Sequence, residues 1–214
     1  MKPIGSCAFL LKRFSIDKFE NLIGTGINYT IMERQATIAL LRQYVHGDAL
    51  IRHCLATGAI MRAVAGFFSQ DPARWEVIGI LHDIDFECVK GDMQKHGIMG
   101  AKLLKTAGLP DDIREVVKRH NHVLYTGSYD MPVEIALQAA DSASGLIIAC
   151  ALVKAGHITD VSIRTITRKA KEKSFAAGCD RSRIALIAPI MEIPVFYEHA
   201  LAGMVGIRTE LGLD

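Results

Sequence analysis

Apolar residues recur at the three- and four-residue spacing of amphipathic helices along most of the chain beyond position 32. Asp48 is predicted to be the N-cap of one helix, and Asp71 followed by Pro72 predicts the capped start of the next. No strand signature, internal repeat or low-complexity tract interrupts the series, so the pattern predicts an all-α bundle. The expected helices cover approximately residues 33–45, 48–68, 72–83, 96–107, 110–120, 132–155, 161–173, 181–190 and 194–211.

The predicted helical domain is a single unit over residues 32–214, and residues 1–31 are expected to be a loosely attached N-terminal extension. That extension has basic residues near short apolar pieces. It lacks the apolar core and the small-residue cleavage site of a secretory signal. Strong helical periodicity begins only at Met32-Glu33, which places the domain boundary there.

The apolar segment from Ile78 to Phe86 contains His82 and Asp83 side by side, and Asp85 follows two residues later. Apolar neighbours predict that this segment is buried, and a buried charge without a partner costs several kcal/mol. A divalent metal ion would satisfy an adjacent imidazole and carboxylate together. We therefore expect this segment to lie at the centre of a metal site.

Further histidines and one more carboxylate lie near predicted helix ends or inside apolar helices, where a bundle builds inward-facing metal sites. Imidazole and carboxylate ligands without thiolate favour iron, manganese, zinc, cobalt or nickel. The set is larger than one catalytic ion uses while keeping an open position, so it suits two ions bridged by Asp83. Water between two such ions has a lowered pKa and can attack phosphorus. The candidate ligands are His53, His82, Asp83, His96, His120 and Asp141.

The composition of the 214-residue chain is that of an ordinary soluble protein, with 25 basic and 23 acidic residues. This balance makes no case for nucleic acid or a membrane as a partner, and no apolar run reaches the ~20 residues of a membrane span. The five cysteines form no CxxC pair, which favours reduced thiols and a cytoplasmic location. The most basic stretch, residues 164–183, has no interleaved aromatic residue beyond Phe175, and we interpret it as a solvated helix face.

The segment 81–85, with the sequence LHDID, is preceded by an isolated His53 and followed by Asp141 in an apolar helix. This pattern resembles the H…HD…D motif of the HD superfamily of metal-dependent phosphohydrolases, in its HDIG-type branch. His96 and His120 resemble the additional ligands of the binuclear members of that superfamily.

The resemblance covers approximately residues 32–214 and implies an HD-type helical bundle with two divalent ions. It implies that metal-bound water hydrolyses a phosphate monoester or diester in a small phosphorylated substrate, for which a nucleotide is the expected class. Residues 173–181 also resemble a C-terminal signature of one uncharacterised bacterial subfamily of predicted hydrolases. Two alternatives would use the same residues: an HD-type di-iron oxygenase and a non-catalytic nucleotide-sensing module.

The chain departs from the family pattern at two places. Asp85 stands where the HDIG motif has glycine. It either orients a ligand histidine or the attacking water, or it is a solvent-facing carboxylate at a helix end, as we interpret Glu87. Cyclic-dinucleotide phosphodiesterases of the superfamily have two adjacent histidines where this chain has His120-Asn121, and their Gly-Tyr-Pro motif is missing here. The sequence therefore disfavours cyclic di-GMP as the substrate.

Charged side chains beside the ligands complete the predicted site. Asp83, Asp85 and Arg119 are expected to be catalytic. Cationic groups near the ligands are expected to bind the phosphate of the substrate, and the histidine in the following loop is expected to face it. The predicted substrate-binding residues are Lys95, Lys102, Arg119 and His122.

Overall fold

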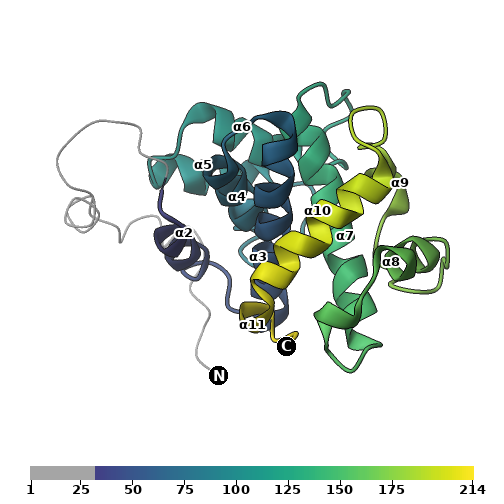
Figure 1. Cartoon of the computed structure of the whole chain (residues 1–214). Coiled ribbons are helices and arrows are strands. Elements are labelled where there is room, and N and C mark those ends of the chain that lie inside the picture. Colours follow the sequence, from purple (N-terminus) through teal and green to yellow (C-terminus); the bar gives the residue numbers. More distant parts are fainter. Residues whose placement is uncertain (1–31) are drawn as a thin grey trace.

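The computed structural model describes residues 32–214, which consist of helices and their connections with no β-strand (Figure 1). The all-α prediction is confirmed for this part of the chain, and the expectation for residues 1–31 lies outside the described residues. The α-helices are α2 (Arg34–Leu41), α3 (Asp48–Ala65), α4 (Pro72–Leu81), α5 (Ile98–Thr106), α6 (Asp111–Arg119), α7 (Pro132–Leu152), α8 (Ile163–Ala170), α9 (Arg181–Ala185), α10 (Ile193–Gly206) and α11 (Arg208–Leu211), with short 3-10 turns at Gly66–Phe68 and Ile158–Asp160.

The start of α4 follows the local sequence. Asp71 Oδ1 accepts hydrogen bonds from the backbone N–H groups of Ala73 at 2.9 Å and Arg74 at 3.2 Å. Pro72 occupies the first turn, where its missing N–H group costs no helical hydrogen bond. The predicted cap and proline are therefore confirmed, and they fix the start of the helix that leads to His82.

The start of α3 differs from the prediction. Gly47 is the N-cap, Asp48 is the first helical residue, and no side-chain capping bond is made there. Instead, the backbone N–H groups of His46 and Gly47 donate to the Glu87 carboxylate at 3.0 and 2.8 Å. Glu87 is half-buried, and beyond the solvent-facing role that the sequence predicts it joins the chain after Asp83 to the N-terminal end of the helix that carries His53.

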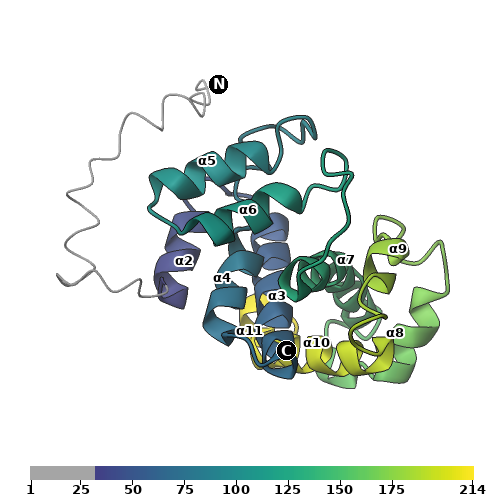
Figure 2. The same cartoon turned by 90° about the horizontal axis from the view of Figure 1, so that it is seen from above.

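Helix α3 lies at the centre of the fold and packs against α4, α7 and α10 (Figure 1 and Figure 2). The α3–α4 contact is close because two glycines face each other. A Cβ atom on Gly79 would lie 2.6 Å from the Cα atom of Gly58, nearer than any real contact allows. This close approach brings the imidazole rings of His53 and His82 to a centroid distance of 5.1 Å.

Helix α7 is a 21-residue apolar helix. By length and composition it could cross a membrane, but 67% of its most apolar window is buried inside the fold. Leu137, Leu146 and Ile147 on this helix are fully buried in the core. A helix that is apolar on most sides and buried by its neighbours is a core helix, and α7 holds Asp141 within this core.

The C-terminal helices are shorter than their periodicity predicts. The helix expected over residues 181–190 ends at Ala185, and Ile207 separates α10 from α11. The helix expected over residues 161–173 covers only Ile163–Ala170, with Ser162 as its N-cap. Turns therefore replace helix at several places where the apolar pattern continues.

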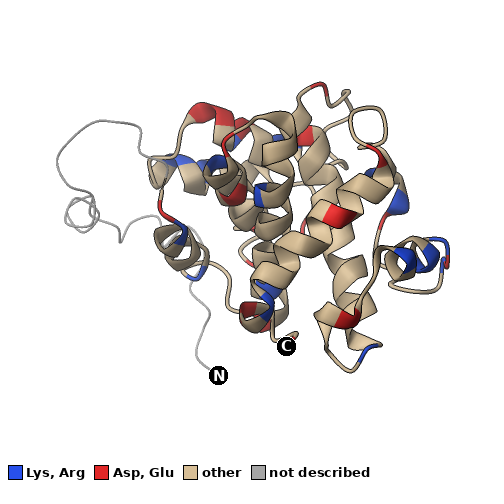
Figure 3. Ribbon diagram, in the orientation of Figure 1, with Lys and Arg blue, Asp and Glu red and all other residues tan. Residues whose placement is uncertain are grey.

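The basic stretch divides into two environments. Arg164 and Arg168 on α8 are exposed, as a solvated face requires, and Figure 3 shows basic residues gathered on that helix. Arg181 behaves differently, because its guanidinium group donates to several backbone carbonyl oxygens of the α8–α9 connection and holds it together. The acceptors are the carbonyl oxygens of Ala170, Glu172, Phe175, Ala176 and Cys179.

Candidate metal centre

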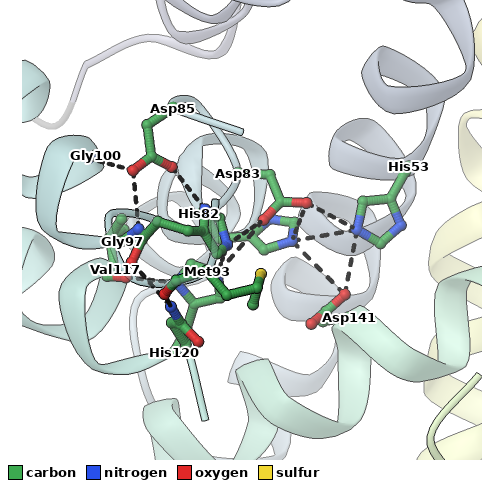
Figure 4. A network of polar contacts seen from close by, with 12 residues as sticks. His53, His82, Asp83, Asp85, Met93, Gly97, Gly100, Val117, His120 and Asp141 are labelled. Atoms are coloured by element: carbon green, nitrogen blue, oxygen red, sulfur yellow. Dashed lines mark hydrogen bonds and ion pairs between the residues drawn. The ribbon is translucent and has the colours of Figure 1, made fainter. Parts of the chain in front are cut away.

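The six predicted ligands converge in the interior of the fold. Figure 4 shows five of them facing one another: His53, His82, Asp83, His120 and Asp141. The six ligands form two groups, and within each group the ligand atoms all lie within 4.8 Å of one another. The first group is His53, His82 and Asp141, and the second group is Asp83, His96 and His120. Among residues 32–214, the structure thus brings together all six side chains that the sequence pattern selected as metal ligands.

Helix ends supply most of these side chains. His53 and Asp141 lie within α3 and α7. His82 and His120 are the C-cap residues of α4 and α6, and His96 lies just ahead of α5. At these positions the backbone is partly free of helical hydrogen bonding, so nearby carbonyl oxygens are available to bind the imidazole rings.

Backbone carbonyl oxygens orient two of the histidines. His82 Nδ1 lies 2.7 Å from the carbonyl oxygen of Gly79, and His120 Nδ1 contacts the carbonyl oxygen of Val117. A carbonyl oxygen only accepts, so Nδ1–H donates in each case and the neutral ring has its lone pair on Nε2. Nε2 of His82 faces Nε2 of His53 at 3.2 Å.

Ser144 orients the ring of His53. Its hydroxyl donates to the backbone carbonyl oxygen of Asp141 at 2.7 Å, and it therefore accepts from His53 Nδ1, which lies 3.0 Å away. Nε2 of His53 thus has its lone pair toward the cluster, 3.2 Å from Asp141 Oδ1. Ser144 is not among the residues that the sequence pattern predicted for the site; its position three residues after Asp141 on an apolar helix is the signal that could have identified it.

Asp83 presents one carboxylate oxygen to each group. Oδ2 lies 3.5 Å from His53 Nε2 and 3.4 Å from His82 Nε2. Oδ1 lies 3.3 Å from His96 Nε2 and 3.4 Å from His120 Nε2. Burial alone would raise the pKa of Asp83, but the imidazoles of His82, His120 and His96 hold it well below its usual value. This concentration of imidazole nitrogens and carboxylate oxygens could hold divalent transition metals.

Asp85 is fully buried, so the interpretation of it as a solvent-facing carboxylate is wrong. Its Oδ1 accepts from His96 Nδ1 at 2.9 Å, and its Oδ2 accepts from the N–H groups of Gly97 at 2.8 Å and Gly100 at 2.7 Å. Gly97 has a φ of 79°, a conformation that glycine adopts without strain. Because both carboxylate oxygens are engaged, we infer that Asp85 orients His96 and caps α5 rather than contacting the substrate.

Protonation of His96 links the site to pH. Burial alone would lower the pKa of His96, but the hydrogen bonds and charges of Asp83 and Asp85 raise it from 6.5 to about 9. Since this pKa is raised in the folded state, the protonated ring stabilises the metal-free fold fully below pH 6.5, and this stability is lost as the pH rises through about 9. A metal ion bound by His96 would displace this proton, so metal affinity should rise over the same range.

We therefore expect the unfolding free energy of the metal-free protein to fall between pH 6.5 and about 9. Urea denaturation in the presence of a chelator, repeated at several pH values, measures this fall. His96→Gln is the matched variant and should show a flatter profile. A wild-type profile as flat as that of the variant would contradict the assignment of the raised pKa to His96.

Asn121 has a structural role. It is buried, and its Nδ2 donates to the carbonyl oxygens of Met93 at 2.7 Å and His96 at 3.0 Å. Its Oδ1 accepts from the backbone N–H of Val123 at 3.0 Å. The residue that stands in place of a second histidine therefore fixes the loop carrying His96 against the end of α6.

Arg119 is engaged with two neighbours. Its Nη1 lies 2.7 Å from Glu134 Oε1, and its Nη2 donates to the hydroxyl of Tyr125 while the guanidinium lies over the Tyr125 ring. Glu134 is only 2% exposed, so Arg119 neutralises a buried carboxylate at the start of α7. The catalytic and substrate-binding roles expected for Arg119 stay predictions beside this structural one.

The other predicted substrate-binding residues face solvent. Lys95 Nζ lies 2.6 Å from Asp92 Oδ2 and its side chain is 67% exposed, while Lys102 is exposed on α5. His122 is exposed, and its pKa is lowered by partial burial and by the charge of Arg183. Contact between these side chains and a substrate stays a prediction.

Arg183 belongs to the site, although the sequence pattern assigned it to a solvated face. Its Nη2 lies 2.7 Å from Asp141 Oδ2, and its side chain is 13% exposed. The solvated-face interpretation is therefore wrong for Arg183, as it is for Arg181, because the folded chain surrounds each guanidinium with acceptors. No local pattern marks this partner, since Arg183 and Asp141 lie on different helices.

Comparison with known proteins agrees with this geometry. Residues 50–148 match the family model described as HD domain, and this range contains all six candidate ligands. Among curated proteins, ribonuclease Y of Mycoplasma genitalium is 29% identical over 94 residues. That match covers 44% of this chain and 19% of the relative, so the chain spans about a fifth of that protein's length. No solved structure showed a significant match.

Proposed function

We propose that this chain, whose residues 50–148 match the HD-domain family model, hydrolyses a phosphate monoester or diester with two divalent transition-metal ions. The observation that carries the proposal is the Asp83 carboxylate. Its Oδ2 faces His53 and His82, and its Oδ1 faces His96 and His120. A carboxylate shared between two histidine groups suits a pair of ions that clamps the attacking and leaving oxygens of a phosphoester.

Ions held by the two groups, from among iron, manganese, zinc, cobalt and nickel, would stabilise charge on phosphoryl oxygens and lower the pKa of bound water. Hydrogen bonds from other residues of the chain orient the ligand side chains. The carbonyl oxygen of Gly79 and the hydroxyl of Ser144 hold the rings of His82 and His53. Asp85 holds the ring of His96. Pre-orientation of this kind strengthens metal binding because the ligands need not reorganise.

The proposal requires no covalent nucleophile from the protein. Cys54, the buried thiol beside the cluster, is fully enclosed. Burial first, and then the charges of Asp83 and Asp141, raise the pKa of its thiol well above the ordinary value. The reactive thiolate is therefore suppressed, which supports attack by water.

A nucleotide diester is the substrate class that we favour. The matched relative is named a ribonuclease, and ribonucleases cleave phosphodiester bonds. We propose that the exposed groups of Lys95, Lys102 and His122 meet the phosphate of the substrate, and that the protein acts in the cytoplasm. The free thiols of Cys54, Cys150 and Cys179 suit that compartment.

The test is elemental analysis of protein purified without oxygen, followed by hydrolysis assays with each metal found. Bis(p-nitrophenyl) phosphate, p-nitrophenyl phosphate and short RNA oligonucleotides separate diester from monoester activity. We expect about two metal ions per chain and metal-dependent release of p-nitrophenol. Dioxygen consumption by a di-iron form without hydrolysis would instead support the oxygenase. Tight nucleotide binding without turnover by any metal form would support the sensing module.

A further inference from the structure

A chain of polar contacts connects α9, which lies outside the matched HD range, to both ligand groups. Arg183 Nη2 lies 2.7 Å from Asp141 Oδ2, and Arg183 Nε donates to Gln138 Oε1 at 2.8 Å. Gln138 Nε2 in turn donates to the backbone carbonyl oxygen of His120 at 3.0 Å. We propose that Arg183 is a positioning residue that fixes Asp141 for metal binding, with Gln138 holding its guanidinium in place.

The two oxygens of Asp141 are used differently. Oδ1 lies 3.2 Å from His53 Nε2 and 3.7 Å from His82 Nε2, whereas Oδ2 faces Arg183. An unrestrained carboxylate rotates about its terminal torsion, which has broad energy wells. The ion pair with Arg183 limits that rotation and keeps Oδ1 directed at the first group.

The planar guanidinium group suits this task. Its nitrogens form a rigid fork, so it contacts the carboxylate of Asp141 and the amide oxygen of Gln138 at the same time. Gln138 is 1% exposed, and its own amide is held by the carbonyl oxygen of His120. A lysine at this position would keep the charge, but its single ammonium group lacks the rigid fork that reaches both partners.

The surrounding chain fixes Arg183 itself. Asp180 caps α9 by accepting from the N–H of Ser182 at 2.9 Å, and Arg181 binds the carbonyl oxygens of the preceding connection. Cys179 Sγ donates to the carbonyl oxygen of Ser142, the residue after Asp141 on α7. The segment ahead of α9 is therefore tied to the helix that carries Asp141.

Two effects of Arg183 on metal binding have opposite signs. A guanidinium near a divalent cation repels it, so through charge alone the loss of Arg183 would strengthen binding. Through orientation, the loss of Arg183 would weaken binding, because outer partners of metal ligands typically contribute 10- to 100-fold in affinity. The engaged, 13%-exposed side chain points to orientation as the larger effect.

The experiment titrates the metal-stripped full chain with Mn²⁺ alone in a calorimeter, without any substrate. Arg183→Gln should weaken the Mn²⁺ affinity by roughly 10- to 100-fold. The Mn²⁺ affinity of Arg183→Lys should lie between those of the wild type and Arg183→Gln. If Arg183→Gln does not fold, the affinity of Arg183→Lys tests the inference in its place. Arg164→Gln on α8 removes an exposed charge and is the matched control, for which we expect the wild-type affinity.

A double-mutant cycle tests the route of the effect. If Arg183 acts through Asp141, Arg183→Gln should change the affinity by less than about threefold when Asp141→Asn is already present. The inference is overturned if the fold-losses of Mn²⁺ affinity multiply in the double variant. It is also overturned if the Arg183→Gln single variant has an unchanged or higher affinity.

The inference rests on the proposed metal centre, and the titration separates the two. If the wild type binds two Mn²⁺ ions and the Arg183→Gln variant binds them equally well, only the positioning role is overturned. If Arg183→Gln binds Mn²⁺ more weakly but the wild type hydrolyses no phosphoester, the positioning role is upheld. Only the proposed hydrolase function is then contradicted. A wild type that binds no divalent metal would overturn both.

Discussion

Asp83→Ala is expected to abolish metal loading of both groups and phosphoester hydrolysis with it. Asp83 is the residue whose carboxylate oxygens approach all four histidines, at 3.3 to 3.5 Å. Removal of an outer partner of a metal ligand already costs 10- to 100-fold in affinity, so the loss of a shared ligand should exceed about 100-fold. Elemental analysis and the bis(p-nitrophenyl) phosphate assay measure the two losses on the same preparation.

Two further variants sharpen this result. Asp83→Asn keeps the shape of the side chain and removes its charge, so we expect weak metal binding with little hydrolysis. Asp160→Ala removes an exposed carboxylate and should match the wild type in both measurements. Metal at the wild-type stoichiometry in Asp83→Ala would show that the shared-carboxylate assignment is wrong, whatever the activity.

Asp85→Ala is expected to destabilise the fold and to empty the second group selectively. The change leaves the buried N–H groups of Gly97 and Gly100 without their acceptor and His96 without its partner. Removing one member of a buried, hydrogen-bonded pair costs roughly 3 to 5 kcal/mol. Urea denaturation measures the loss of stability, and elemental analysis should show a fall from about two ions per chain to about one.

The same variant distinguishes positioning from proton transfer. If Asp85 acts through His96, activity should follow the metal content, and Asp85→Asn, which keeps one acceptor oxygen, should be intermediate in stability and metal content. Asp85→Gly introduces the residue of the HDIG motif and should be no more stable than Asp85→Ala. Full metal content in Asp85→Ala, with the loss of one limb of the pH–rate profile, would instead identify Asp85 as a general acid or base.

The contacts that maintain the candidate site extend beyond the range that matches the HD-domain family model. Residues 50–148 contain every candidate ligand, yet Arg183 on α9 holds one oxygen of Asp141. Glu87 likewise links the chain after Asp83 to the start of α3, which carries His53. The site is therefore maintained by contacts between segments that are far apart in the sequence, and truncation after residue 148 would remove one of them.

The sequence by itself determined the elements whose signals are local. Asp71 and Pro72 predicted the start of α4 because a capping carboxylate accepts from N–H groups two and three residues away. The apolar run around His82 predicted that the imidazole is buried, and it is 0% exposed. The types of the candidate ligands were also visible, because imidazole and carboxylate groups in apolar helices are chemically distinctive wherever they occur.

Only the tertiary structure decided which polar side chains have partners. The acceptor for Gly97 and Gly100 is Asp85, 12 and 15 residues away, and the partner of Arg183 lies on another helix. Hydrophobic periodicity reports which face of a helix is buried, but it does not report which charged group from a distant segment packs against it. The local pattern around Asp85 and Arg183 is equally compatible with a side chain in solvent and with a side chain that contacts the candidate metal centre. The packing of α5 and α9 against the core places both side chains at that centre.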